Sequence, residues 1–153
     1  MEGVTVDLRN GLKAIAGLGG YAQGDLLSGV ENVIGSNFTD VLTGDEGDNR
    51  INGGGGADTM TGGGGNDTFV FLSGFGNDRI EDFDADPANG QDSLDISAFG
   101  VAPDDFANRV AITDVGADTL VSIRPDGVVA PSQTILLAGI DDAATITQQD
   151  FVF

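Results

Sequence analysis

Carboxylates recur at a fixed spacing in the middle of the chain, and this spacing is the first feature that could do chemistry. Four consecutive nine-residue segments carry an aspartate or asparagine at their sixth position, and a fifth does so after a two-residue insertion. These residues are Asp40, Asn49, Asp58, Asp67 and Asp78. Carboxylate, amide and carbonyl oxygens are the ligands that calcium prefers. The spacing therefore predicts a row of cation sites rather than one catalytic centre.

The rest of the composition leaves few other kinds of chemistry open. The 153-residue chain has no His, Cys or Trp, so thiolate and imidazole metal sites and Ser–His or Cys–His catalytic pairs are excluded. Its 25 acidic and 6 basic residues give a net charge of −19, which disfavours nucleic acids and anionic membranes as partners. Of the acidic residues 21 are aspartate, the type found in turns and compact oxygen-ligand loops. No apolar run reaches the length of a membrane span.

Glycine and one apolar position define the elements that must hold these carboxylates. Of the 25 glycines, 13 lie between Gly35 and Gly76. The eighth position of each repeat is a large apolar residue: Leu42, Ile51, Met60, Phe69 and Ile80. Six glycine-rich residues favour a turn, and the next three favour a short strand with one inward side chain. This pattern is the nonapeptide signature of a parallel β-helix or β-roll that binds calcium in its turns.

Two nonapeptides complete one coil, so turns two repeats apart should stack. Stacking pairs Asp40 with Asp58, Asn49 with Asp67 and, across the insertion, Asp58 with Asp78. A strand spacing of about 4.7–4.9 Å leaves room for one ion between stacked turns, and we expect about two to four ions. The candidate ligands in the repeats are Gly35, Asn37, Asp40, Gly44, Glu46, Gly47, Asn49, Gly53, Gly54, Gly55, Gly56, Asp58, Gly62, Gly63, Gly64, Gly65, Asp67, Gly74, Gly76 and Asp78.

Further aspartates follow the last repeat. Asp82, Asp84 and Asp86 imitate the start of an EF-hand loop, but a proline and a serine stand where that loop needs glycine and glutamate. Either these side chains hold an extra ion or they lie in a solvated loop. Asp82 and Asp84, together with Asp92, complete the set of candidate calcium ligands.

The repeats bury little apolar surface for their length. Each coil buries only two large apolar side chains, which is too little to offset the conformational entropy lost by ordering two nonapeptides. Stacked carboxylates also repel one another when no cation lies between them. We therefore expect the repeat region to be largely disordered without calcium and to fold on binding it.

The flanking segments also favour β-structure. Val4, Val6 and Leu8 alternate with polar residues and predict a half-buried strand, and 14–16 is a second candidate. After the repeats, strands are expected at 110–113, 119–123 and 134–140, as antiparallel strands that cover the open end of the roll. A short helix is expected at 104–108 or 143–149.

The fold class expected is all-β. It is a right-handed parallel β-roll with calcium in the turns, capped by β-rich flanks. The predicted divisions are an N-terminal lead-in (1–34), the calcium-binding roll (35–95) and a C-terminal cap (96–153).

The segment from Gly35 to Ile80 resembles the RTX, or haemolysin-type calcium-binding, repeats of secreted bacterial proteins. Residues 24–35 resemble the lead-in to such repeats, and residues 79–84 and 90–99 resemble the stretch that follows the last one. The final segment, 147–153, resembles the acidic-then-aliphatic end of an uncleaved type I secretion signal. The first repeat departs from the pattern, because Ser36 and Phe38 stand at glycine positions.

This resemblance implies a calcium-binding module of a secreted or cell-surface bacterial protein that lacks a Sec signal peptide. Sites of the extracellular class have dissociation constants of about 10⁻⁴–10⁻³ M, so they would be empty in the cytosol and filled outside. The expected partners are calcium, the type I secretion machinery and an N-terminal effector domain of a parent chain. We expect no enzymatic activity of the module itself.

Two alternatives stay open. One is an adhesive or polysaccharide-binding module of a surface protein or extracellular enzyme, which glycan binding at saturating calcium would support. The other is a fragment of an enzyme such as a protease, lipase or epimerase. Turnover by this chain would support the fragment, and the absence of His and Cys argues against it.

Overall fold

Short strands dominate the computed structural model, which describes residues 3–9, 29–87, 90–124 and 133–153. The strands are β1 (Thr5–Asp7), β2 (Asn32–Ile34), β3 (Val41–Thr43), β4 (Arg50–Asn52), β5 (Thr59–Thr61), β6 (Thr68–Val70), β7 (Asn77–Ile80), β8 (Ser93–Asp95), β9 (Val110–Asp114), β10 (Thr119–Ile123), β11 (Gln133–Leu137) and β12 (Phe151–Val152). The helical pieces are η2 (Ser97–Phe99), α1 (Phe106–Arg109), η3 (Ala143–Thr145) and η4 (Gln148–Asp150). In this described part, no helix is long and apolar enough to cross a membrane.

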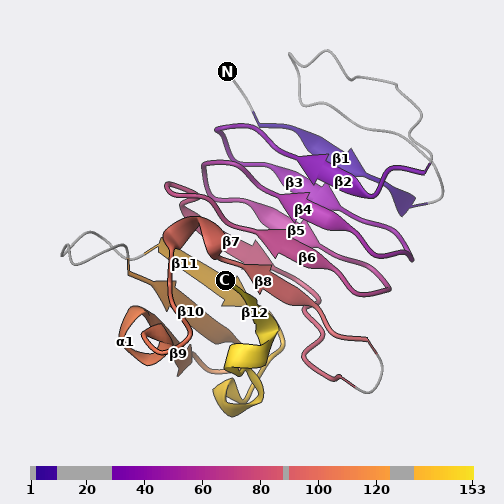
Figure 1. The fold of residues 1–153 in the computed structure, drawn as a ribbon. Helices are drawn as coiled ribbons and strands as arrows, with labels where there is room; N and C mark the ends of the chain where they lie inside the picture. The colour runs from indigo at the N-terminus through magenta and orange to yellow at the C-terminus, as the bar shows by residue number, and fades with distance from the viewer. Residues whose placement is uncertain (1–2, 10–28, 88–89, 125–132) are drawn as a thin grey trace.

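The repeat strands alternate between two sheets that face each other across the core (Figure 1). The larger sheet has the order β1-β3-β5-β7-β11-β10-β9, and the smaller has the order β12-β8-β6-β4-β2. Strands two repeats apart pair in parallel, as Leu42 does with Met60 and Ile51 with Phe69. Two nonapeptides therefore make one coil, and the predicted parallel β-roll is confirmed.

The core of the roll is built from the single inward side chain of each repeat. All five of these residues are fully buried: Leu42, Ile51, Met60, Phe69 and Ile80. The two-residue insertion adds Phe71, whose ring lies 4.8 Å from that of Phe75, and Phe75 in turn packs against Phe99. The insertion thus enlarges the core where the roll meets the C-terminal part of the chain.

The N-terminal segment forms one of the predicted flanking strands. Strand β1 pairs in parallel with β3, with Val6 opposite Leu42, and Leu8 is buried. Val4 and Val6 pack against the core while remaining partly exposed, as their alternation with polar residues predicts. The second candidate strand, 14–16, lies outside the described residues.

The C-terminal strands continue the sheets of the roll. Strand β10 has the predicted bounds and pairs antiparallel with β9 and β11, but β11 pairs in parallel with β7, with Leu136 opposite Arg79. These strands are antiparallel to one another, as predicted, and they cap the last coil by extending the larger sheet, because the free edge of β7 offers its backbone hydrogen bonds to β11. Helical turns form near both predicted places, as α1 and as the 3-10 helices η3 and η4.

Candidate metal centre

The turns between strands stack in two columns, one on each side of the roll. The first column holds the turns 35–40, 53–58 and 71–76, each of which leads from the smaller sheet to the larger one. The second column holds 44–49, 62–67 and the longer loop 81–92, which lead back. The predicted ligands are divided between these columns because successive nonapeptides turn in opposite directions.

The carboxylates of each column reach back to the coil before them. In the first column, Asp40 N donates to Asp58 Oδ1 at 2.9 Å and Asp58 N donates to Asp78 Oδ1 at 3.1 Å. In the second column, Asn49 N donates to Asp67 Oδ1 at 2.8 Å. The structure thus brings together all three pairs that the nine-residue period predicts.

A fourth pair was not predicted. Asp67 N donates to Asp92 Oδ1 at 2.8 Å, so Asp92 takes the place in the second column that a further repeat would supply. Asp92 is 25 residues beyond Asp67, because the loop 81–92 interrupts the period. The only sequence signal is the short strand that follows, since Leu94 pairs with Phe69 as an eighth-position residue would.

Two carboxylate oxygens in the first column find no hydrogen-bond partner among the described residues. Asp58 Oδ2 and Asp78 Oδ2 are buried and accept no hydrogen bond from this part of the chain, and the two residues are 1% and 3% exposed. A buried polar atom without a partner is costly and rare in folded proteins. A calcium ion is a fitting partner for these oxygens, because carboxylate oxygen is its preferred ligand. The residues present therefore fit the metal that the repeat pattern implies.

Glycine at the start of each turn makes room for these carboxylates. A side chain at Gly53 would contact Asp58 Oδ2, and one at Gly62 would contact Asp67 Oδ2. Gly54 has a φ of 93°, and a Cβ there would also collide with the carbonyl oxygen of Ser36 in the coil below. Only glycine combines this left-handed backbone with so close an approach of two turns. The turns are therefore built to bring carboxylate and carbonyl oxygens together.

Burial raises the pKa of the paired carboxylates. Desolvation is the main cause in each case, and it raises the pKa of Asp58 to about 6 and those of Asp67 and Asp78 to about 7. Neighbouring carboxylates add to the effect, Asp40 for Asp58 and Asp92 for Asp67. The pKa of Asp92 is raised too, again mainly by desolvation. Such sites disfavour the charged form until a cation is present.

The first turn differs from the others. Asp40 Oδ1 accepts from Val4 N and Ser36 Oγ, and its Oδ2 accepts from Ser36 N. Protein donors thus satisfy both oxygens that a metal would need. Among the repeats, the degenerate 35–40 turn is the one whose carboxylate is least available for calcium.

The other predicted ligands lie in or beside the two columns. Asp82 accepts from Gly62 N and Gly63 N, which places it in the second column. Asp84 Oδ1 accepts from Asp86 N, within its own loop. The turns themselves contain Gly35 and Asn37; Gly44, Glu46 and Gly47; Gly55 and Gly56; Gly64 and Gly65; and Gly74 and Gly76. In the described residues no three acidic side chains gather closely enough to hold an ion by themselves, so other oxygens, such as backbone carbonyls of the turns, would complete any site.

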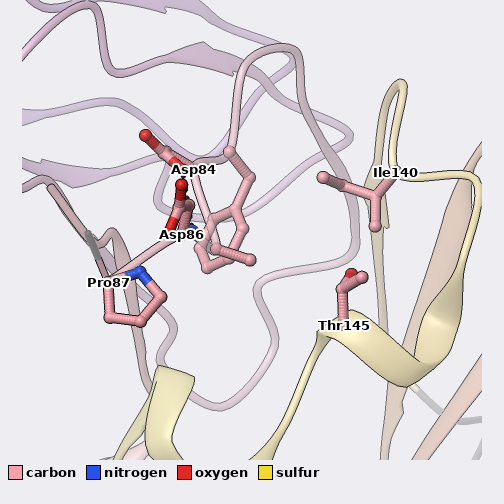
Figure 2. A pocket seen from close by; sticks show the side chains of 7 residues that line it. Asp84, Asp86, Pro87, Ile140 and Thr145 are labelled. Atoms are coloured by element: carbon pink, nitrogen blue, oxygen red, sulfur yellow. Dashed lines mark hydrogen bonds between the residues drawn. The ribbon is translucent and has the colours of Figure 1, made fainter. Parts of the chain in front are cut away.

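A cavity that the sequence did not predict lies where the loop 81–92 meets the C-terminal part of the chain. Its volume is about 390 Å³, and it is lined by Phe83, Asp84, Ala85, Asp86, Pro87, Ile140 and Thr145. Figure 2 shows Ile140 and Thr145 on one side and the loop residues on the other. The loop after the last repeat therefore faces the C-terminal segment across a mostly apolar gap.

Comparison with known proteins agrees with this geometry. Residues 34–69 match the family model of the RTX calcium-binding nonapeptide repeat, in four copies. The solution structure of the AlgE6R3 subunit of the Azotobacter vinelandii mannuronan C5-epimerase is similar over 80% of this chain and 77% of that one, with 29% identity and a TM-score of 0.54. The solution structure of the AlgE6R2 subunit of the same epimerase is similar over 82% of this chain and 94% of that one, with 25% identity and a TM-score of 0.56. No curated protein matches the chain.

Residues 34–69, with their stacked glycine turns and paired carboxylates, are therefore RTX calcium-binding nonapeptide repeats, carried on a β-roll similar to the repeat subunits of that epimerase.

Proposed function

We propose that this chain is a calcium-responsive folding module of a secreted bacterial protein. The observation that carries the proposal is the pair of buried carboxylate oxygens, on Asp58 and Asp78, that accept no hydrogen bond from any residue the structure describes. Without a cation these desolvated, mutually repelling groups oppose the folded state. Because the turns exist as sites only when the coils are stacked, the free energy of calcium binding is also free energy of folding.

Specific residues would hold the ions. In the first column these are Asp58 and Asp78, and in the second they are Asp67 and Asp92, each set completed by backbone carbonyls of the glycine turns. Calcium supplies the positive charge that neutralises the stacked carboxylates. The chain's own contribution is geometric: it holds each carboxylate over the preceding coil by a backbone hydrogen bond.

The cellular role follows from calcium concentration. RTX repeats are typical of secreted proteins. In the cytosol the sites stay empty, and a chain with a net charge of −19 remains extended by self-repulsion, which suits export through a narrow channel. Outside the cell, calcium fills the turns and the roll forms. In this proposal residues 147–153 carry the type I secretion signal, an effector domain precedes the roll in the parent chain, and the module is not itself catalytic.

Far-ultraviolet circular dichroism and calcium titration calorimetry test this proposal. We expect β-sheet signal with millimolar calcium, its loss after chelation, and weaker binding by Asp58→Ala. Asp104→Asn, which removes an exposed charge outside the turns, serves as the matched control and should behave like the wild type. A spectrum that is unchanged by chelator would overturn the proposal.

A second candidate is a polysaccharide-binding module. Two similar solved structures are subunits of a mannuronan C5-epimerase, which favours a module attached to a polysaccharide-modifying enzyme. Titration of the calcium-saturated protein with mannuronan distinguishes the two roles. Saturable binding would support the second candidate, and no heat of binding would leave calcium-driven folding as the module's role.

A further inference from the structure

The C-terminal segment is part of the folded core. Strand β12 pairs in parallel with β8, with Phe151 opposite Leu94, and Ile96 N donates to Val152 O at 3.0 Å. Phe151 and Ile146 are buried. Within the segment for which the sequence predicts an export signal, Asp150 and Phe151 are buried, whereas residues 147–149 and 152–153 are exposed. Strand β12 lies beside β8 (Figure 1).

Asp150 anchors this segment as a buried carboxylate. It is 1% exposed, and its Oδ1 accepts from Gln91 Nε2 at 2.6 Å. Its Oδ2 accepts from Thr147 N at 2.6 Å and from Thr147 Oγ1 at 3.1 Å. In the described part of the chain no ion pair includes Asp150. Its hydrogen-bond donors are all neutral groups. The loss of one of them would leave a buried carboxylate oxygen without a donor, which is energetically costly.

Gln91 joins this anchor to the metal turns. Its backbone N donates to Asn66 Oδ1, in the turn 62–67, at 3.1 Å. The next residue, Asp92, accepts from Asp67 N at 2.8 Å and from Asp84 N at 2.9 Å. The backbone of Gln91 and the side chain of Asp92 therefore contact the second column, and the side chain of Gln91 contacts the C-terminal segment.

We propose that Gln91 couples calcium occupancy of the second column to docking of the C-terminal strand. Strand β12 is docked on β8, with Phe151 buried, in the calcium-loaded protein and is released in the calcium-free chain, where a protein partner that binds an extended C-terminal segment can bind it. This inference rests on the proposed calcium-dependent folding and adds that docking of the C-terminal strand depends on the same calcium sites. Because coupling is reciprocal, docking of the strand also tightens calcium binding. Gln91 is thus a positioning residue, acting through Asn66 and Asp150.

Hydrogen exchange of residues 147–153, read by mass spectrometry with calcium and with chelator, tests this coupling. In calcium we expect Gln91→Ala to exchange at least about fivefold faster than the wild type and to bind calcium more weakly by a similar factor. Gln149→Ala, an exposed neighbour, is the control and should match the wild type in both measurements. Asn66→Ala cuts the link at its far end, so it should also speed exchange of the tail.

Circular dichroism in calcium separates the possible failures. If Gln91→Ala or Asn66→Ala is folded and its tail exchanges at the wild-type rate, the coupling is refuted while calcium-dependent folding stands. If the wild type stays folded in chelator, the proposed function fails, and the effect of Gln91→Ala on tail exchange in calcium still decides whether the hydrogen-bond link exists. Should Gln91→Ala not fold, the exposed turn variant Asn66→Ala carries the test.

Discussion

Replacing Asp78 with asparagine should change the stability of this protein in opposite directions with and without calcium. The substitution keeps the shape of the side chain and the oxygen that accepts from Asp58 N. Asn49 shows that the turn accepts an amide at this position, since its Oδ1 accepts from Asp45 N at 2.7 Å. The change therefore removes a buried charge with little change in packing.

The expected magnitude follows from the pKa of Asp78. Burial raises it from 3.8 to about 7, and each pKa unit corresponds to about 1.4 kcal/mol, so the ionised group opposes folding by up to about 4 kcal/mol at pH 8. The amide nitrogen that replaces Oδ2 also lacks a partner, which costs about 1–3 kcal/mol. We expect Asp78→Asn to raise the free energy of unfolding in chelator by about 1–3 kcal/mol.

In calcium the same substitution should be harmful. Loss of a charged ligand should weaken the affinity of that site by about tenfold or more. At saturating calcium this lowers the stabilisation from that ion by about 1.4 kcal/mol or more. Circular dichroism at pH 8 measures the folded fraction in chelator, and urea unfolding at pH 8 measures the stability in millimolar calcium, with Asp104→Asn as the control in both. If the variant is less stable in chelator and loses no calcium stabilisation, the unpartnered oxygen of Asp78 is not a calcium ligand.

Three further predictions concern the same turns. Lowering the pH should stabilise the calcium-free protein, because burial raises the pKa values of Asp58, Asp67 and Asp78 from 3.8 to about 6, 7 and 7, so the native state binds more protons. This stabilisation is full below pH 3.8 and is lost as the pH rises through about 7, so the β-sheet circular dichroism signal in chelator should fall from pH 4 to 8; a signal that rises with pH would contradict it. Asn49→Asp should tighten calcium binding in the second column and destabilise the calcium-free roll, as calorimetry and unfolding would measure; unchanged affinity would mean that position 49 does not face an ion. Gly54→Ala should destabilise the calcium-loaded roll by about 1–3 kcal/mol, because its φ of 93° suits glycine, and an unchanged urea midpoint would show that the turn relaxes at no cost.

The sequence alone predicted the parts of this protein that repeat. A nine-residue period fixes which side chain of each strand points inward and which turns stack, because the same local geometry recurs in every coil. Leu42, Met60 and Ile80 therefore lie in one row of the core, as predicted. The pairing of Asp58 with Asp78 survives the insertion because the extra residues lie in the turn 71–76, and the strand after it keeps its phase, with Ile80 opposite Met60.

The tertiary structure decided what happens where the period stops. Three contacts join residues that are 36 to 59 positions apart along the chain. Val4 donates a hydrogen bond to Asp40, β11 pairs with β7, and Gln91 donates a hydrogen bond to Asp150. No local pattern encodes these contacts. They form because each end of the roll exposes unpaired strand edges and polar groups, and the segments that lie close enough in the folded chain are the ones that satisfy them.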